Sequence, residues 1–253
     1  MKTIRTNKFV RKIQSEIGAT DPYIAVQQLV ARYRASGDTL ERLAERLGVI
    51  GITVTKMAFD GGIFEEPSGL SIRLNAKSTP KRRRFTLAHE IAHLIVAAGN
   101  ARGARRSHAC TDLERACDTV AAELLMPFDE FCHAARGDAS TARLLALADE
   151  FEVSPHAAAV RLNELGVWTE SMGLWSWDGD ARELWFVGKR LWPEKTIYMS
   201  TFELAVRRGS YKGSEMITSL GRGAFPVFLD VRRLGTERVY VIAVLWDSYR
   251  RRG

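Results

Sequence analysis

The sequence has few cysteines and no long apolar run, and both shortages exclude classes of protein. Its 253 residues contain only Cys110, Cys117 and Cys132, a number too small, and odd, for a disulfide scaffold. The longest apolar segments, such as residues 239–246, are far shorter than the roughly 20 residues that cross a bilayer. The basic start of the chain also lacks the apolar stretch of a signal peptide. We therefore expect a cytoplasmic protein with reduced thiols and no membrane partner.

The rest of the composition is that of an ordinary globular protein. Hydrophobic residues make up 46% of the chain and charged residues 26%, which is enough to build a sizeable core. The net charge is +7, with basic clusters at 2–12, 81–84, 102–106 and 250–252. This charge is suited to attracting nucleic acid or an acidic or DNA-bound protein, and it does not choose between them.

Histidines are also scarce, yet two of the five stand in the pattern His89-Glu90-Ile91-Ala92-His93. Residues four apart lie on one face of a helix, so the two imidazoles can converge on one ion. A third protein ligand would leave the fourth position of a zinc ion for water, whose pKa the metal lowers toward neutrality. Glu90 could then take the proton as general base. The pattern predicts a catalytic zinc site.

The segment around this pattern is expected to be a long buried helix. Thr79 and Pro80 form a start signal and Gly99 a stop, and the residues between them are apolar on nearly every side. The competing interpretation is an exposed helix with two satisfied histidines. A buried glutamate and two buried histidines are costly unless they are paired, hydrogen-bonded or bound to metal, which favours zinc.

A second predicted helix, 111–126, ends at Pro127 and carries two acids one turn apart, Glu114 and Asp118. Glu114 could complete a two-His-one-Glu site, and Asp118 could accept a hydrogen bond from a ligand imidazole and fix its tautomer. Alternatively, Thr111 and Glu114 form a capping box, which needs no metal. The position of both acids at the edge of the apolar face favours the site.

Two motifs, in this order, resemble the ImmA/IrrE-type metallo-endopeptidases. They are Arg84-Phe85-Thr86-Leu87-Ala88-His89-Glu90-Ile91-Ala92-His93-Leu94 and Glu114-x-x-x-Asp118-x-x-Ala121-Ala122-Glu123-Leu124-Leu125-Met126-Pro127.

The resemblance extends over roughly residues 22–168 and implies a gluzincin-like site with one Zn²⁺. In that site His89, His93 and Glu114 would be the metal ligands and Glu90 the catalytic base. Members of the family typically act on helix-turn-helix repressors of stress genes or mobile elements, so the resemblance also implies a regulatory protein as substrate.

The chain departs from the family pattern at two positions of the second motif. Cys117 and Val120 stand where Ala and Phe are usual, whereas Asp118 stands where Asn or Asp is usual; ligation is left intact. Cys117, one turn from Glu114, could reach the metal or respond to oxidant, but a small buried thiol in place of alanine is the favoured interpretation. The basic segment 101–106, between His93 and Glu114, is unusual for the family. His108 with Cys110 is interpreted as a loop before a helix cap and not as a metal pair.

Around the motifs we expect an α+β fold: a mainly helical zincin-like domain with a small sheet, followed by a smaller α+β domain. Helices are predicted at 23–34 and 39–47, strands at 50–55 and 70–74, and a glycine-rich loop between the strands. The sheet beside the zinc helix would form one wall of a peptide cleft, where an extended substrate could add as a strand. The expected domains are a basic extension, 1–21, a metallopeptidase domain, 22–168, and a sensing or recognition domain, 169–253.

Two predicted helices, 142–151 and 154–165, are spaced like a helix-turn-helix pair. The second offers only Arg161 and Asn163 as obvious contacts to DNA, so a packing role is favoured. After Trp168, aromatic residues surround a predicted hairpin turn at 178–180. Strands are expected at 225–231 and 238–246 and a helical piece near 201–208. The tryptophans are more typical of a core than of a ligand box.

Three functions follow from these observations, and the first is favoured. It is a zinc endopeptidase that cuts a regulatory protein, with an oxyanion donor for which His133, His156 and several tyrosines are candidates. The second is a DNA-binding regulator with a structural or vestigial zinc site. The third is an interaction protein or toxin-like partner that recognises its target through residues beyond Trp168.

Overall fold

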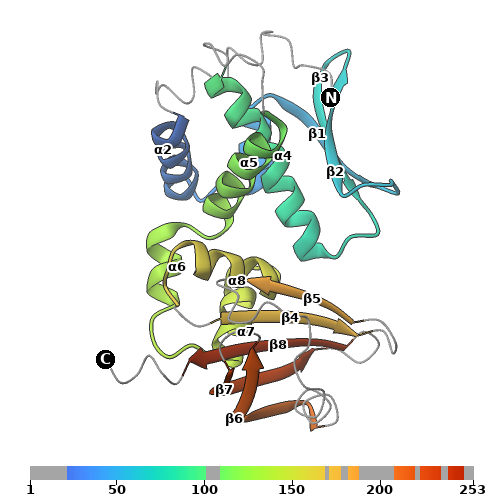
Figure 1. Ribbon diagram of the computed structural model, residues 1–253. Helices are drawn as coiled ribbons and strands as arrows, with labels where there is room; N and C mark the ends of the chain where they lie inside the picture. Colours follow the sequence, from blue (N-terminus) through green and yellow to red (C-terminus); the bar gives the residue numbers. More distant parts are fainter. Residues whose placement is uncertain are drawn as a thin grey trace. The chain divides into compact units, whose positions relative to one another are not determined.

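The computed structural model describes residues 22–100, 109–168, 171–177, 182–187, 208–219, 223–234 and 239–247 (Figure 1). The chain divides into two compact units, Met1–Phe128 and Asp129–Gly253. Each unit combines helices with a sheet, so the predicted α+β class is confirmed. Among the described residues, no helix combines the length and the apolar character that a membrane span requires.

The first unit is built on a three-stranded sheet of order β1-β3-β2. The strands are β1 (Val49–Thr55), β2 (Gly61–Glu66) and β3 (Gly69–Asn75). The central strand, β3, runs parallel to β1 and antiparallel to β2. Six of its seven residues are buried, because a strand between two neighbours and beneath a helix has little surface left.

Strand β2 lies where the sequence predicted only a loop, and that part of the prediction is wrong. Its pairing with β3 places Ile63 opposite Ile72 and Phe64 opposite Ser71. Two glycines at its start hid the strand, because glycine is depleted in strands. Gly61 is needed there, since a Cβ at this position would lie 2.5 Å from Cγ2 of Thr86. The missing side chain lets β2 approach helix α4.

Helix α4 (Pro80–Asn100) lies between the sheet and the helices α2 and α5 (Figure 1). Its predicted start is confirmed, because the Thr79 hydroxyl accepts a hydrogen bond from the amide of Arg82 at 3.3 Å. The basic residues at this start have defined partners: both Nε and Nη2 of Arg82 donate to Asp60 in the β1–β2 connection. Apolar residues of the helix, such as Ile91 and Ala92, are fully buried.

Helix α5 (Ala109–Leu125) packs against α4, and it ends two residues before the predicted stop at Pro127. Two further helices among the described residues of this unit are α2 (Pro22–Ala35) and α3 (Leu40–Arg46), as predicted. Thr39 caps α3 by accepting from the amide of Arg42.

The second unit contains a five-stranded antiparallel sheet of order β5-β4-β8-β7-β6. Its strands are β4 (Ser171–Trp177), β5 (Arg182–Val187), β6 (Ser210–Ser219), β7 (Gly223–Leu234) and β8 (Val239–Asp247). The predicted hairpin is confirmed, since Leu174 of β4 pairs with Trp185 of β5. Strand β6 was not predicted, because its sequence is mostly polar.

The described residues of the same unit and its boundary include the helices α6 (Phe128–Ala134), α7 (Thr141–Glu150) and α8 (Pro155–Glu164). The pair α7 and α8 matches the predicted pair in position. Helix α7 packs on β7 and β8, and α8 on β5. The buried carboxylate of Asp230 on β7 accepts from both the amide and the hydroxyl of Thr141, at 3.0 and 2.8 Å.

These contacts explain why the compact units divide at Phe128 and not at Trp168. The expected metallopeptidase domain, 22–168, was bounded by motif resemblance, whereas compactness follows packing, and the helix pair packs on the second sheet. Several predicted features lie outside the described residues. They are the expected extension 1–21, the basic segment 101–106, His108, the turn at 178–180, Trp192 and most of the helical piece at 201–208.

Candidate metal centre

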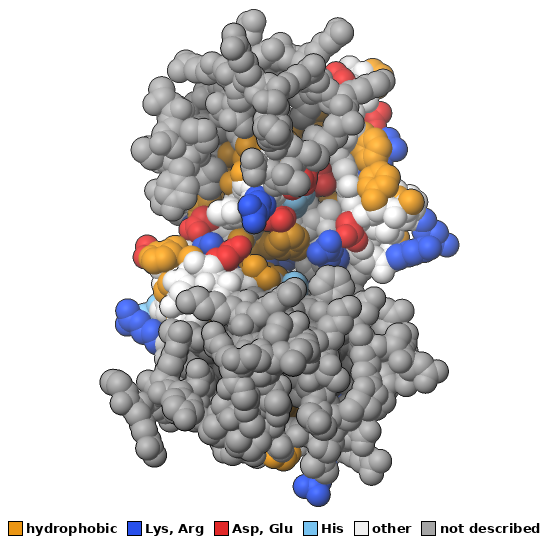
Figure 2. Space-filling view, viewed as in Figure 1, with side chains coloured by type: hydrophobic (Ala, Val, Ile, Leu, Met, Phe, Trp, Pro, Cys, Tyr) orange, Lys and Arg blue, Asp and Glu red, His pale blue; other side chains and the backbone are white. Residues whose placement is uncertain are grey.

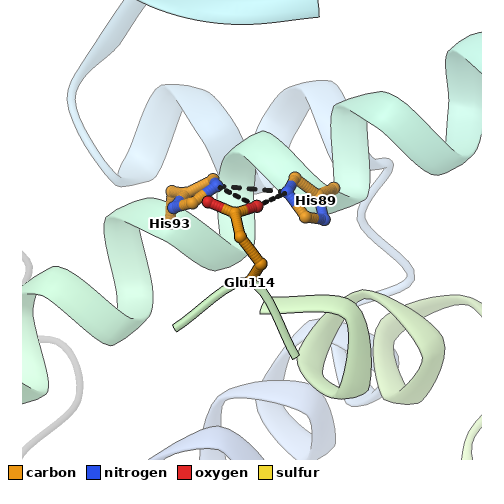
Figure 3. A group of neighbouring side chains, drawn as sticks. All are labelled: His89, His93 and Glu114. Atoms are coloured by element: carbon orange, nitrogen blue, oxygen red, sulfur yellow. Dashed lines mark hydrogen bonds and ion pairs between the residues drawn. The ribbon is translucent and has the colours of Figure 1, made fainter. Parts of the chain in front are cut away.

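Two neighbouring helices bring together the three residues that the sequence analysis selected as metal ligands. His89 and His93 lie one turn apart on α4, and Glu114 reaches toward them from α5 (Figure 3). In the described part of the chain, this is the group of histidine, cysteine and acidic side chains whose donor atoms are close enough to share one ion.

The donor atoms of this group are separated by distances that suit a tetrahedral ion. Nε2 of His89 lies 3.1 Å from Nε2 of His93 and 3.2 Å from Oε2 of Glu114. Nε2 of His93 lies 3.6 Å from Oε2 of Glu114. Ligands about 2.0–2.1 Å from a tetrahedral zinc ion are roughly 3.3–3.4 Å apart. The three atoms therefore form one face of such a tetrahedron, and the residues present fit zinc.

The site is only partly covered. The side chains of His89 and His93 are 18% and 14% exposed, whereas that of Glu114 is 41% exposed. The imidazoles are thus held in the protein while the carboxylate side faces solvent, which leaves access for water and a substrate.

Each histidine has a further partner on α5 at its second ring nitrogen. Nδ1 of His89 donates to Oδ1 of Asp118 at 2.9 Å, the contact that the sequence suggested for this acid. Nδ1 of His93 lies 3.4 Å from Sγ of Cys117. This second contact was not predicted from the sequence, although the position of Cys117 one turn from Glu114 had placed the cysteine near the metal site.

The surroundings shift the pKa values of the two histidines in opposite directions. The hydrogen bond to Asp118 raises the pKa of His89, against the opposing effect of burial. Burial, followed by repulsion from His89, lowers the pKa of His93. The pKa of His89 is therefore higher than that of His93, so the His89 imidazole takes up a proton first as the pH falls.

Glu90 and Cys117 are both buried beside these residues. Glu90 is 9% exposed, and burial raises the pKa of its carboxyl group. Burial, with the nearby carboxylates of Glu114 and Asp118, raises the pKa of the Cys117 thiol to about 12. A thiol with such a pKa stays neutral, which favours the small buried thiol over an oxidant-responsive thiolate.

The capping-box alternative for Glu114 is not supported. Helix α5 begins at Ala109, so Thr111 lies inside the helix and not at its N-cap. The Glu114 carboxylate instead contacts His89 and His93.

One of the two residues of α8 that were expected to contact DNA is buried and the other, Asn163, is exposed. Arg161, one of two expected DNA contacts, is 4% exposed, which agrees with the favoured packing role of α8. On the face shown in Figure 2, Lys and Arg side chains of the described residues are interspersed with Asp and Glu. His133 and His156 both lie in the second unit, and neither is assigned a role as oxyanion donor.

Comparison with known proteins finds a family for the part of the chain that carries these residues. Residues 47–163 match the family model described as the IrrE N-terminal-like domain, a peptidase family. The radiation response metalloprotease IrrE of Deinococcus radiodurans is 30% identical over 151 residues, which are 55% of this chain and 45% of the relative. Residues 47–163 therefore match the IrrE-type peptidase family, and the resemblance read from the two motifs is confirmed.

A solved structure is similar over a longer part of the chain. A Mycobacterium tuberculosis transcriptional regulator matches with a TM-score of 0.56 and 13% identity, over 95% of this chain and 82% of that one. At this identity the similarity supports the α+β fold alone. The match to IrrE, in turn, spans less than half of that protein's length.

Proposed function

We propose that this protein is a zinc-dependent endopeptidase that hydrolyses a peptide bond in a regulatory protein. The observation that carries the proposal is the convergence of Nε2 of His89, Nε2 of His93 and Oε2 of Glu114 within 3.1–3.6 Å of one another. The match of residues 47–163 to a peptidase family, and the similarity to the metalloprotease IrrE, support the same reaction.

In this proposal His89, His93 and Glu114 hold one Zn²⁺, and Asp118 orients His89. A set of two imidazoles and one carboxylate is typical of catalytic zinc sites, which keep one position open, whereas structural sites are closed by four protein ligands. Zinc, when bound, supplies Lewis acidity that lowers the pKa of a water molecule and polarises a peptide carbonyl group.

Glu90 acts as the general base and then as the general acid. Its carboxylate takes a proton from the attacking water and delivers it to the nitrogen of the leaving amine, so that the C–N bond breaks without release of an amide anion. Burial suits both steps, because a carboxyl group whose pKa is raised holds a proton more readily than an exposed one.

The proposed substrate is a helix-turn-helix repressor of stress or mobile-element genes, as the family resemblance implies. The sheet beside α4 could bind an extended segment of it: among the described strands, β1 and β2 each pair only with β3, so each has an edge that can accept a further strand. Within the second unit, the strands after Trp168 are the proposed recognition or sensing module.

The decisive experiment separates catalysis from metal binding. The full chain is expressed with repressors encoded beside its gene, and cleavage is followed for wild type and for Glu90→Gln. We expect cleavage by wild type and a loss of at least about 100-fold in Glu90→Gln, the scale of general acid–base catalysis. Glu45→Gln, an exposed acid on α3, is the matched control and should cleave normally. Equal cleavage by Glu90→Gln and wild type would contradict the assigned role.

Metal content tests the ligands independently of any substrate. After purification and dialysis, Glu90→Gln should retain one zinc per chain, whereas His93→Ala should lose most of it, because removing a ligand leaves only two protein donors. Equal loss in both variants would overturn the division between base and ligands.

A DNA-binding regulator is the outcome that would replace this proposal. It would appear as DNA binding with a steep dependence on salt that survives both chelation and Glu90→Gln, in a protein that cleaves none of the repressors.

A further inference from the structure

Cys117, the partner of the second ring nitrogen of His93, has no role in the proposed reaction. Sγ of Cys117 lies 3.4 Å from Nδ1 of His93, and the cysteine has no exposed surface. Cys117 stands on α5 between Glu114 and Asp118, each of which also contacts a histidine of α4. Three side chains of one helix thus contact the metal-binding histidines of the other.

We propose that Cys117 is a positioning residue, whose sulfur accepts a hydrogen bond from Nδ1–H of His93 and so presents Nε2 of that ring to the metal. The inference rests on the proposed function, because it takes His93 as a zinc ligand. A neutral imidazole carries its proton on one nitrogen only, so a partner that accepts from Nδ1 leaves the lone pair on Nε2. Nε2 is the atom that faces His89 and Glu114.

The distances distinguish this role from that of a fourth metal ligand. A ligand sulfur would have to converge on the same point as the three donor atoms, whereas Sγ contacts the opposite side of the His93 ring, at Nδ1. The 3.4 Å separation is ordinary for a hydrogen bond to sulfur, a larger and weaker acceptor than oxygen. Cys117 therefore acts through His93.

The two histidines are consequently held with different strength. His89 donates to a carboxylate at 2.9 Å, a charge-assisted bond, whereas the acceptor for His93 is sulfur, which is a weaker hydrogen-bond acceptor than oxygen. His93 is the more weakly fixed ligand, so zinc affinity should respond to the acceptor at position 117.

The test measures zinc affinity by competition with a chelator for wild type, Cys117→Ala, Cys117→Val and Cys117→Ser. Alanine and valine remove the acceptor, and valine keeps most of the volume; serine keeps an acceptor. We expect zinc dissociation constants about 10-fold higher for alanine and valine, the lower end of the effect of such outer partners, and recovery to near the wild-type value with serine. Cys132→Ala is the control for loss of a thiol outside the site.

A second measurement follows the Nδ1 proton of His93 by NMR in the zinc-loaded protein. It should be visible and slow to exchange in wild type and Cys117→Ser, and should exchange rapidly in Cys117→Ala. In the cobalt-loaded wild type, no thiolate-to-metal charge-transfer band should appear. Thermal unfolding of each metal-free variant checks that the fold is kept.

Four results would overturn the inference. If wild type binds zinc but alanine, valine and serine bind it equally well, Cys117 has no positioning role and the proposed function stands. If alanine and valine weaken binding but serine does not restore it, the effect is packing and not acceptance of a hydrogen bond. A charge-transfer band would make Cys117 a ligand. If wild type itself binds no zinc, the proposed function fails together with this inference.

Discussion

His89 and His93 are chemically identical side chains whose second ring nitrogens contact different groups. Nδ1 of His89 contacts the Asp118 carboxylate, and Nδ1 of His93 contacts the Cys117 thiol. A carboxylate raises the basicity of the imidazole that donates to it, and thus strengthens that imidazole as a ligand. Much of the affinity of the proposed site should therefore depend on two residues that do not touch the ion.

Asp118→Asn should weaken zinc binding more than any change at Cys117. The amide keeps an acceptor oxygen but loses the charge that assists the bond, so we expect the zinc dissociation constant to rise about 10–100-fold. Chelator competition measures the change. Asp138→Asn, at an exposed aspartate outside the site, should leave the constant unchanged; an equal effect in the two variants would contradict the role of Asp118.

At the residue scale, contacts between side chains of one helix were predicted from the sequence better than contacts between side chains of two helices. The i, i+4 spacing brings His89 and His93 to one face of α4, and the same spacing places Glu114 and Asp118 together on α5. The contact of Cys117 with His93 depends on how α4 and α5 cross, which the spacing of residues within either helix does not determine.

Among the elements, strand β2 packs against helix α4 through one close approach, at Gly61. A Cβ on Gly61 would meet Cγ2 of Thr86 at 2.5 Å and the carbonyl oxygen of Arg73 at 3.1 Å. The Thr86 hydroxyl donates to the carbonyl of Arg82 at 3.0 Å, so its methyl group is not free to rotate away. The carbonyl of Arg73 belongs to the central strand and cannot move alone.

Gly61→Ala should therefore destabilise the first unit. We expect the free energy of unfolding in urea to fall by about 1–3 kcal/mol, as for other overpacked sites. Gly51→Ala is the matched control, because a Cβ at that strand position meets nothing within 4 Å; its effect should stay within about 0.5 kcal/mol. Equal stabilities of the two variants would show that the contact at Gly61 relaxes without cost.

The elements that the sequence predicted are those with strong periodicity or clear caps. Helices α3, α4 and α8 are preceded by Thr39, Thr79 and Ser154, whose hydroxyls accept hydrogen bonds from the backbone amides three residues further on. Strands β2 and β6 carry glycine and polar residues instead. They exist because neighbouring strands supply their hydrogen bonds, which is tertiary information.

At the scale of the whole molecule, each compact unit is held together by contacts of its own. In the second unit, the carboxylate of Asp230 is 2% exposed and accepts from Thr141, 89 positions away. It also lies 3.2 Å from Nζ of Lys212. One buried acid thus joins the start of α7 to two strands of the sheet. The sequence could not indicate this link, because nothing in the local pattern distinguishes Asp230 from a surface aspartate.

Asp230→Ala should lower the free energy of unfolding of the second unit by about 1.5–3 kcal/mol, the range for hydrogen bonds to a charged group. Zinc affinity, which belongs to the first unit, should not change. Lys212→Ala is the control: its side chain is 59% exposed, so its loss should cost less than about 1 kcal/mol. A fall in zinc affinity with Asp230→Ala would show that the two units are energetically coupled.

The placement of the three donor atoms on two helices has a consequence for folding. An ion bound by His93 and Glu114 would act as a cross-link between α4 and α5, closing the intervening chain into a loop and removing conformations from the unfolded state. Loading the site would then do for this sequence, which has only three cysteines, what a disulfide does for a secreted protein. Amide hydrogens in the facing turns of α4 and α5 would be the first to exchange when the ion leaves.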